Sequence, residues 1–388
     1  MRDRYLHRHI AEDLKEKMVF IGGPRQVGKT TLAEKIIGKT CKSAYFNWDN
    51  RADRKRIMAS EWPGDAELVI LDEIHKYSKW KNLVKGEYDK LKDTYKFLVT
   101  GSARLDLYRR GGDSLQGRYH YYRLHPFTLP ELHETLNTFE PFAALTVPES
   151  KSGAELAALE TFGGFPEPLL KGNMRTLRRW HNEKIERLFR EDVQDLMLVR
   201  DIGSMKLLCD SIPARIGSLL SINSLREDLG VSHRAVSHWI DVLESFYYAF
   251  RVYPYAGNNI RSLKKGPKLY LWDWSEVIEP GARFENLVAS HLLKLVHFLY
   301  DAEGYKCNLH FLRDREKREV DFLVTVNDRP WFAVEAKSSD DSLAPSLSHF
   351  KDKLKIPFVY QVVRKDGVDW LKDGIRIISA DKFLESLV

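Results

Sequence analysis

The segment GGPRQVGKTT near the N-terminus combines residue types and a spacing that suit phosphate binding. Residues 23–30 fit the pattern G-x-x-x-x-G-K-[ST] in full. Glycine at the two fixed positions lets the backbone curl so that successive amides point at phosphate oxygens. The lysine then reaches the β- and γ-phosphates, and the threonine hydroxyl ligates Mg²⁺. We therefore predict that ATP and Mg²⁺ bind here, at Gly23, Pro24, Arg25, Gln26, Val27, Gly28, Lys29, Thr30 and Thr31.

Two flanking elements must position this loop. The apolar run MVFI before it predicts a strand, and LAEKII after it predicts a helix that starts near Lys29. The helix would add the positive end of its dipole to the phosphate site. A strand before the loop and a helix after it form the context in which this motif binds nucleotides.

A second apolar run, ELVILDE, ends in two carboxylates. A continuous apolar run is typical of a buried parallel strand, and α/β sheets bind ligands beyond the carboxyl ends of such strands. We assign Asp72 to Mg²⁺ and Glu73 to orienting the attacking water. The alternative is that these acidic residues end the strand merely to meet solvent.

The next run, KFLVTGSA, and the residues after it supply further polar groups. The hydroxyl of Ser102 would sense the γ-phosphate or hold the water. An ATPase that works as a ring needs an arginine from the neighbouring subunit to stabilise transition-state charge. Arg118 is the first candidate, and an ion pair within its own domain is the alternative. It belongs to a group of arginines: Arg104, Arg109, Arg110, Arg118 and Arg123.

The first third of the chain alternates short apolar runs with helical patterns. The runs are MVFIGG, SAYFNW, ELVILDE and YKFLVTGSA. This alternation predicts the α/β class, with a parallel sheet covered by helices. The Pro- and Ser-containing stretch at residues 138–153 indicates a domain boundary.

The segments GPRQVGKTTL, LVILDEI, VTGSA, SLQGRY, LHPFTLPEL and GGFPE together resemble a family of prokaryotic AAA-type ATPases with a characteristic C-terminal region. The resemblance covers most of the chain and implies a P-loop core, a helical lid and a nuclease-like C-terminal part. One departure is His75, where glutamine is expected, although imidazole also donates a hydrogen bond. We expect an ATPase core over 1–137, a helical lid or linker over 138–215, a winged helix-turn-helix over 216–268 and a nuclease-like domain over 269–388.

Residues 223–246, NSLREDLGVSHRAVSHWIDVLESF, predict a helix-turn-helix. Gly230 suits a turn with positive φ, and Ser232 suits the cap of the second helix. That helix has an apolar face of Ala235, Val236, Trp239 and Ile240. Its outer face offers groups that reach base edges and phosphates in a major groove, namely His233, Arg234, Ser237 and His238. The following FYYAFRVYPY suggests a wing. A rigid spacer and a protein-docking surface are the alternatives to DNA contact.

The segment REVDFLVTVNDRPWFAVEAKSS predicts a hairpin that turns at NDRP. Centring the hairpin on Asp328 gives one apolar face and places Asp321 opposite Glu335, with Lys337 on the same side. Adjacent carboxylates repel unless a divalent cation or a proton lies between them. We predict a metal site at Asp321 and Glu335, with Glu285 as a further ligand and Lys337 steering or activating a water.

This order of residues resembles the PD-(D/E)XK nuclease family, in which Mg²⁺ held by such carboxylates promotes phosphodiester hydrolysis. The resemblance implies a restriction-endonuclease-like α/β domain. Two alternatives stay open: Lys337 makes surface ion pairs with Glu335 and Glu319, or the nuclease fold is kept without cleavage.

The bulk composition sets limits on the functional class. The net charge is +6, which permits a nucleic-acid partner without requiring one. The three cysteines, Cys41, Cys209 and Cys307, form no paired motif, and the charged N-terminal segment has no signal-peptide core. Together with the lack of a long apolar run, these features predict a cytoplasmic protein without a membrane partner.

Three functional hypotheses follow. The first is an oligomeric AAA-type ATPase, in a ring, that couples ATP hydrolysis to DNA binding and processing. The second is an ATP-dependent signalling switch that binds a protein partner in defence or toxin control. The third is an ATP-regulated, metal-dependent DNA endonuclease.

Overall fold

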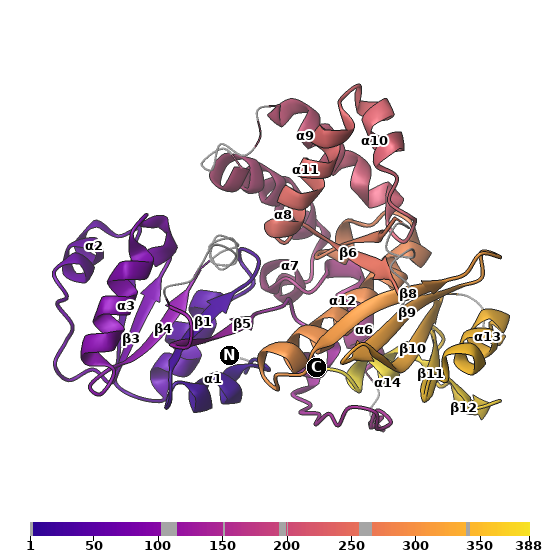
Figure 1. Ribbon diagram of the computed structural model, residues 1–388, viewed down its shortest axis with the longest axis horizontal. Helices are drawn as coiled ribbons and strands as arrows, with labels where there is room; N and C mark the ends of the chain where they lie inside the picture. The colour runs from indigo at the N-terminus through magenta and orange to yellow at the C-terminus, as the bar shows by residue number, and fades with distance from the viewer. Residues whose placement is uncertain are drawn as a thin grey trace. The chain divides into compact units, whose positions relative to one another are not determined.

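The computed structural model describes residues 3–101, 115–149, 152–193, 199, 201–255, 266–338 and 342–388, and the statements below concern those residues. The chain divides into two compact units, Met1–Pro126 and Phe127–Val388, each of which is described by itself (Figure 1). The predicted division into four domains stays a prediction.

The first unit is built on a five-stranded sheet in the order β2-β3-β4-β1-β5. All of its strand pairs are parallel, which confirms the predicted α/β class with a parallel sheet. The four predicted runs form the first four strands; a fifth pairs with β1. The strands are β1 (Met18–Gly22), β2 (Ser43–Asn47), β3 (Leu68–Asp72), β4 (Lys96–Thr100) and β5 (Tyr119–Arg123).

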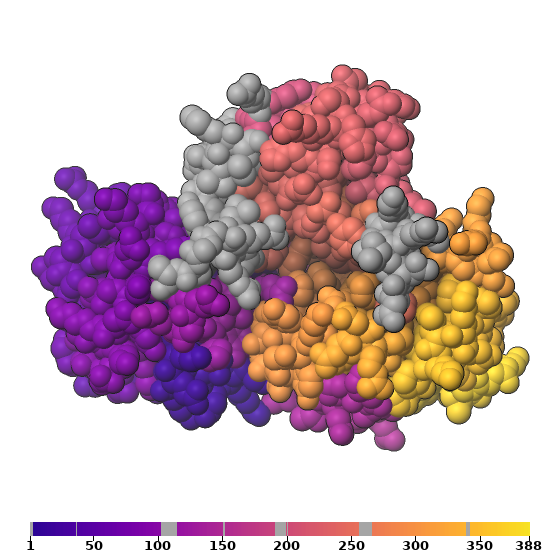
Figure 2. Space-filling view, in the orientation of Figure 1, coloured from indigo at the N-terminus to yellow at the C-terminus, as the bar shows by residue number. Residues whose placement is uncertain are grey.

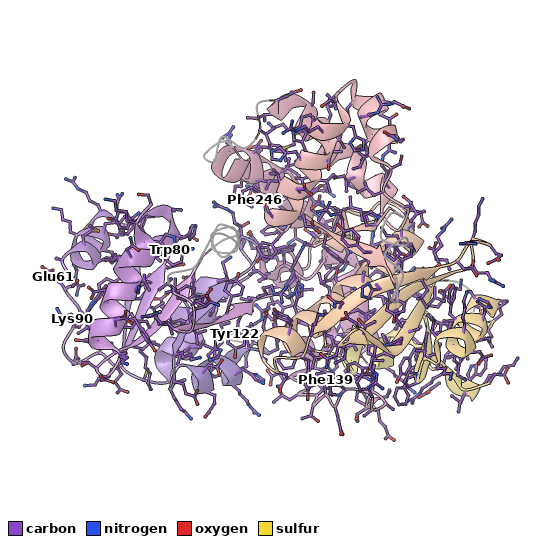
Figure 3. The ribbon with its side chains drawn as sticks, in the orientation of Figure 1. Glu61, Trp80, Lys90, Tyr122, Phe139 and Phe246 are labelled. Carbon is purple, nitrogen blue, oxygen red and sulfur yellow. The ribbon has the colours of Figure 1, made fainter. Side chains whose placement is uncertain are left out.

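Helices cover this sheet because its strands are apolar on both faces; every residue of β1 and β3 is buried. Trp80 of α3 lies against the sheet, with its ring centroid 5.9 Å from that of Phe20 (Figure 3). The helix after the phosphate loop begins at Lys29, as predicted, and continues as a π-helix. The helical elements are α1 (His7–Asp13), η1 (Thr31–Ile36), η2 (Ile37–Lys39), α2 (Arg51–Met58), η3 (Ile74–Lys76) and α3 (Trp80–Leu91).

The second unit contains an eight-stranded mixed sheet in the order β12-β13-β11-β10-β9-β8-β6-β7. The pairs β10–β11, β11–β13 and β6–β8 are parallel, and the others are antiparallel. The strands are β6 (Ala249–Pro254), β7 (Lys268–Leu271), β8 (Cys307–Arg313), β9 (Glu319–Val326), β10 (Arg329–Lys337), β11 (Phe358–Val363), β12 (Asp369–Lys372) and β13 (Ile375–Ser379).

The long helix α12 (Pro280–Asp301) packs on the central strands β8, β9 and β10 and is largely buried (Figure 1). Most of the other helices precede it in the chain. They are α5 (Leu129–His133), α6 (Gly153–Phe162), α7 (Pro166–Lys171), α8 (Met174–Arg187), η4 (Leu188–Val193), α9 (Ile202–Ser211), η5 (Ile212–Arg215), α10 (Ile222–Leu229), α11 (His233–Ser245) and η7 (Trp274–Glu276); α13 (Pro345–Leu354) and α14 (Ala380–Glu385) follow it.

The helices α10 and α11 confirm the predicted pair of helices with a short turn between them. Gly230 has φ of +66° at the end of α10, and Ser232 caps α11 by accepting a hydrogen bond from the Ala235 amide. The strand expected in a wing, β6, pairs with β7 and, through Tyr253 and Pro254, with β8. It is therefore shared with the large sheet, and the winged-helix assignment stays a prediction.

Among the described residues, no helix combines the length and the apolar character that crossing a bilayer requires.

Candidate functional site

The backbone of the phosphate loop has the conformation that its glycines allow. Gly23 and Gly28 have φ of +137° and +102°, and Gln26 between them is also left-handed, at +59°. A Cβ atom at Gly23 would lie 2.5 Å from the carbonyl oxygen of Leu124. A side chain does not fit there, so this glycine is required by both conformation and space. Of the nine predicted residues, 23–28 thus lie between β1 and the following helix, and Lys29, Thr30 and Thr31 form the start of that helix.

Lys29 lies over this loop and is buried. Its Nζ donates hydrogen bonds to the carbonyl oxygens of Gly23 and Pro24, at 2.9 and 2.6 Å. Both carbonyls belong to the loop that the motif assigns to phosphate, so the ammonium is already at the predicted site. A bound phosphate would offer it charged acceptors in place of these neutral ones.

The predicted magnesium residues are brought together at the end of β3. Thr30 donates from its Oγ1 to Oδ2 of Asp72 at 2.8 Å, and Thr100 donates to the other oxygen, Oδ1. Asp72 is buried. Its carboxylate and the Thr30 hydroxyl are hard oxygen donors of the kind that Mg²⁺ prefers, so these residues fit the ion.

Tyr45 of β2 belongs to the same site, although no motif in the sequence points to it. Its hydroxyl donates to Oδ2 of Asp72 at 2.7 Å and accepts from the Asn47 amide at 3.2 Å. Burial, followed by the hydrogen bond to the Asp72 carboxylate, raises the pKa of Tyr45, so the phenol stays a neutral donor. The pairing of β2 with β3 positions it, because Asn47 lies beside Asp72 in that register.

Glu73 follows Asp72 with a left-handed backbone, φ of +56°, which turns the chain out of the strand. Its Oε2 lies 3.4 Å from Lys76 Nζ and 3.6 Å from His75 Nε2. Lys76 also contacts Asp49 at 2.5 Å. Burial by itself would lower the pKa of Lys76, but the Asp49 and Glu73 carboxylates produce a net rise. The histidine that replaces the expected glutamine is therefore in place to contact Glu73.

Of Ser102 and the five arginines, only Arg118 and Arg123 lie within the described residues. Ser102, Arg104, Arg109 and Arg110 lie outside the described residues. Arg118 makes a double ion pair with Asp89 of α3, Nε–Oδ1 2.7 Å and Nη2–Oδ2 3.1 Å. This is the alternative stated from the sequence, and its role toward a neighbouring subunit stays a prediction. Arg123 ends β5, where its carbonyl accepts a hydrogen bond from the Tyr5 hydroxyl at 2.6 Å.

The second helix of the predicted helix-turn-helix is amphipathic in the expected sense. Val236, Trp239 and Ile240 are buried. His233, Arg234 and His238 are exposed, and Ser237 is half-buried. The segment that contains α10 and α11 forms part of the outer surface of the second unit, where it appears in salmon (Figure 2). The predicted DNA-binding residues thus face solvent, and their role stays a prediction.

The hairpin of β9 and β10 confirms the predicted register. Asn327 and Asp328 both have positive φ, +50° and +62°, as a two-residue hairpin turn requires. Phe322 lies opposite Val334 and Val324 opposite Phe332, with an irregularity next to Pro330. The pairs follow from the alternation of apolar residues on one face.

Asp321 and Glu335 are neighbours in this hairpin, as predicted. The Asp321 amide donates to Glu335 Oε2 at 3.3 Å, and the Ala336 amide donates to Asp321 Oδ2 at 3.0 Å. Lys337 Nζ pairs with Glu335 Oε1 at 2.8 Å. Burial, and then the charge of Asp321, raise the pKa of Glu335 to about 7.

Lys268 of β7 is the group that sequence reasoning missed at this site. Its Nζ lies 2.7 Å from Glu319, 3.2 Å from Glu285 and 3.4 Å from Asp321. Tyr270, two residues on, donates to Glu285 Oε1 at 2.6 Å. The signal was the alternation in KLYLWDW, which places Lys268 and Tyr270 on one face of a strand.

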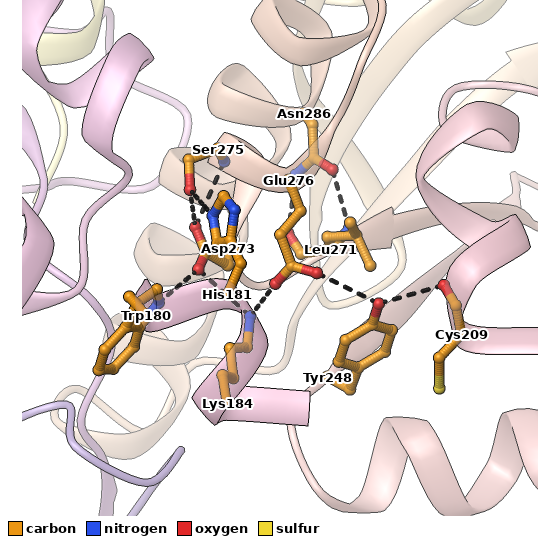
Figure 4. Close-up of polar contacts among 10 residues, drawn as sticks. All are labelled: Trp180, His181, Lys184, Cys209, Tyr248, Leu271, Asp273, Ser275, Glu276 and Asn286. Atoms are coloured by element: carbon orange, nitrogen blue, oxygen red, sulfur yellow. Dashed lines mark hydrogen bonds and ion pairs between the residues drawn. The ribbon is translucent and has the colours of Figure 1, made fainter. Parts of the chain in front are cut away.

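A further polar network joins α8 to the segment after β7 (Figure 4). Asp273 is buried and accepts from Trp180 Nε1 at 3.0 Å and from Lys184 Nζ at 3.3 Å. Lys184 also pairs with Glu276. Donor atoms of His181, Asp273 and Glu276 lie within 4.8 Å of one another, as in a metal site. The Lys184 ammonium already contacts both carboxylates, so this network is a set of structural ion pairs.

The comparison with protein families identifies the part that carries the phosphate loop. Residues 15–133 match the family model described as an AAA domain. This range contains the loop, Asp72 and Glu73. Residues 15–133 are thus similar to an AAA domain. The predicted resemblance is thereby confirmed for this part of the chain.

The rest of the chain matches two families whose function is not known. Residues 154–276 match a domain of unknown function (DUF8612), and residues 280–383 match another (DUF4143). Neither match tests the winged-helix or the nuclease-like assignment, which stay predictions.

Relatives extend over most of the chain. The uncharacterized protein Rv2008c of Mycobacterium tuberculosis is 21% identical over 384 residues, which are 95% of this chain and 81% of that protein. The uncharacterized protein MJ1544 of Methanocaldococcus jannaschii is 24% identical over 337 residues, 80% of this chain and 73% of that protein.

Among solved structures, the chain is similar to a Walker-type ATPase of Pyrococcus abyssi, PABY2304. The identity is 15%, the TM-score is 0.43, and the similarity covers 73% of this chain and 96% of that one. The Orc1 protein of Aeropyrum pernix, solved in complex with DNA, has 15% identity and a TM-score of 0.34 over 74% of this chain and 93% of that one.

Proposed function

We propose that the AAA domain hydrolyses ATP with Mg²⁺ and that the second unit contacts DNA through the outer face of α11. The observation that carries the ATPase proposal is the meeting of Thr30 with Asp72, 2.8 Å apart, at the sheet edge where the phosphate loop places Lys29. Nucleotide, lysine and metal-binding oxygens would then share one site.

Each residue has a separate task in this proposal. The loop amides and Lys29 hold the β- and γ-phosphates and stabilise the charge that develops on them. Thr30 and Asp72 hold Mg²⁺, which supplies charge neutralisation at the phosphates when it is bound. Glu73 orients the water for attack, and His75 and Lys76 set its position through the contacts at 3.6 and 3.4 Å.

The ATPase proposal is tested by measuring phosphate release from the purified protein. Lys29→Ala and Glu73→Gln are expected to abolish hydrolysis, with Glu73→Gln retaining nucleotide binding. The matched control is Lys90→Ala, which removes an exposed lysine of α3. If hydrolysis is absent in the wild type, or unchanged in both site variants, the proposal is wrong.

The DNA proposal is supported by the exposed donors of α11 and has its own test. Binding to duplex, branched and single-stranded DNA is measured at several salt concentrations, since phosphate contacts make affinity fall with salt. Arg234→Ala with His238→Ala should weaken binding, while Arg179→Ala, which removes an exposed side chain of α8, should not. ATP hydrolysis that is slow and unaffected by any DNA would instead favour the switch that binds a protein partner.

We further propose that the AAA domain acts as an oligomer in which Arg118 serves a neighbouring subunit. This role would require Arg118 to leave Asp89, to which it is bound by two hydrogen bonds within its own unit. Hydrolysis by a mixture of Arg118→Ala and Lys29→Ala proteins decides between the two partners.

A further inference from the structure

Two of the three carboxylates assigned to a divalent cation, Asp321 and Glu285, contact a lysine ammonium, and Glu319 contacts it as well. Lys268 reaches the cluster from β7, Glu285 from α12, and Glu319 and Asp321 from β9. The three carboxylates lie 3.2, 2.7 and 3.4 Å from Nζ. Only 3% of the Lys268 side chain is exposed. A buried lysine is rare unless its charge is compensated, and here three carboxylates compensate the charge of Lys268.

Most of the other oxygens of the predicted metal ligands also have donors. Asp321 Oδ2 accepts from the Ala336 amide, and Glu335 accepts from Lys337 and from the Asp321 amide. Tyr270 donates to the Glu285 oxygen that also contacts Lys268. Divalent cations bind several oxygens directly, and most of the oxygens here are already engaged by ammonium, hydroxyl and amide donors. The residues present therefore do not fit a metal in this arrangement.

We infer that Lys268 is the resident cation of this cluster and occupies the place that the nuclease resemblance assigns to a divalent metal. Its ammonium joins β7, α12 and β9 into one ionic cluster. Without metal, the hairpin does not hydrolyse phosphodiesters through Asp321 and Glu335. The nuclease-like residues of the second unit then have a structural role, and any contact with DNA is made without cleavage.

The charge of Lys268 agrees with this role. Burial by itself would lower the pKa of Lys268, but the carboxylates of Asp321, Glu285 and Glu319 raise it. The lysine therefore remains an ammonium at neutral pH. Lys184 makes the same kind of contact with Asp273 and Glu276, so a lysine between carboxylates recurs in this unit.

The test is to remove the ammonium and ask whether metal takes its place. Binding of Mn²⁺ to nucleotide-free protein is counted by electron paramagnetic resonance in an Asp72→Asn background, which removes the metal residue of the AAA domain. That protein should bind no Mn²⁺ at the cluster. Adding Lys268→Met should create one site that Asp321→Asn abolishes, with affinity at least ~10-fold above the background. Lys337→Met, which removes a lysine outside the three-carboxylate contact, is the matched control.

Two results would overturn the inference. One is Mn²⁺ bound at the cluster while Lys268 is intact, shown by loss of that ion in Asp321→Asn. The other is a folded Lys268→Met protein that gains no site, since the lysine would then not be what excludes the metal. If Lys268→Met does not fold alone, it is refolded with Mn²⁺, and the comparison of Asp72→Asn with Asp72→Asn plus Asp321→Asn, both with Lys268 intact, still decides. Because all proteins carry Asp72→Asn, the outcome is separate from that of the ATPase proposal.

Discussion

Tyr45 and Thr30 donate hydrogen bonds to the same oxygen of Asp72, Oδ2, at 2.7 and 2.8 Å. A carboxylate held from two sides has one orientation before any ligand arrives. Tyr45 is thus a positioning residue for the predicted magnesium site, and Tyr45→Phe removes the bond without changing the shape of the side chain.

We expect Tyr45→Phe to raise the Mg²⁺ concentration needed for half-maximal hydrolysis by about 2- to 10-fold, because one hydrogen bond contributes ~0.5–1.5 kcal/mol. The rate at saturating Mg²⁺ should change less. Tyr95→Phe is the control, since that hydroxyl contacts the Pro63 carbonyl instead. An equal loss of rate at all Mg²⁺ concentrations would show that Tyr45 does not act through the metal site.

Substitution by alanine at two glycines of the first unit should change stability in opposite directions. Gly23 has φ of +137°, and a Cβ atom added there would lie 2.5 Å from the Leu124 carbonyl oxygen. Gly23→Ala is therefore expected to destabilise the domain by ~1–3 kcal/mol and to prevent nucleotide binding. Gly86 lies within α3 with nothing within 4 Å of a new Cβ, so Gly86→Ala should stabilise by ~0.5–1 kcal/mol. Urea unfolding with and without nucleotide measures both. Tolerance of alanine at position 23 would contradict the described loop.

Arg118 pairs with Asp89 in the structure, whereas we propose that it serves a neighbouring subunit. Mixing two inactive variants distinguishes these two roles. If Arg118 serves a neighbouring subunit, Arg118→Ala should reduce hydrolysis by ~10³-fold or more. Mixing it with Lys29→Ala should restore activity, because the second variant supplies the arginine to the intact loop of the first. Asp89→Ala, which releases Arg118, should stay active.

The opposite pattern would assign Arg118 to its own unit. In that case Arg118→Ala and Asp89→Ala lose the same ion pair, whose exposed location limits its effect on stability. Mixing with Lys29→Ala would then recover nothing. Particle size measured with and without nucleotide shows in either case whether a ring exists.

Lys294 and Lys306 allow a buried and an exposed ion pair of the second unit to be compared. Lys294 contacts Glu131 and Thr128 with both charged side chains buried, whereas Lys306 pairs with Asp328 at 2.9 Å with both exposed. Lys294→Met leaves Glu131 without its cation and should cost ~3–5 kcal/mol. Lys306→Met should cost ~0–1 kcal/mol. Urea unfolding measures the loss of stability in each variant, and similar losses in both would contradict the described burial.

Local features of the sequence were sufficient to predict the phosphate loop and the hairpin. The loop depends on residues that are consecutive, and its conformation follows from Gly23 and Gly28. The hairpin register follows from the two-residue turn at Asn327 and Asp328 together with the apolar alternation. Residues that are close along the chain determine both the loop conformation and the hairpin register.

Contacts between distant strands could not be predicted in the same way. Lys268 and Asp321 are 53 residues apart along the chain, and their meeting depends on the order of β7, β6, β8 and β9 in the sheet. Tyr45 reaches Asp72 only because β2 is the neighbour of β3. Alternation assigns a face to each residue but does not tell which strand lies beside it, so the lysine among the carboxylates was missed.

His291 of α12 should make the stability of the second unit depend on pH. It is fully buried, its Nε2 accepts a hydrogen bond from the Leu129 amide at 3.2 Å, and its Nδ1 lies 2.8 Å from the Leu287 carbonyl. Burial, with a smaller effect of the Lys294 charge, lowers the pKa of His291 to about 3. An imidazole that accepts at Nε2 must be neutral, so geometry and pKa agree.

The sign follows from proton binding. Below the ordinary pKa near 6.5, His291 binds a proton in the unfolded chain but stays neutral in the folded protein. The contribution of His291 to the free energy of unfolding is therefore present above that pH and is lost as pH falls. The limiting slope is ~1.4 kcal/mol per pH unit. Urea unfolding at pH 7.5, 6 and 5 should show a fall that is smaller in His291→Gln, whereas His233→Gln on the exposed face of α11 should keep the wild-type dependence. Equal pH dependence in wild type and His291→Gln would mean that His291 is protonated in the folded protein.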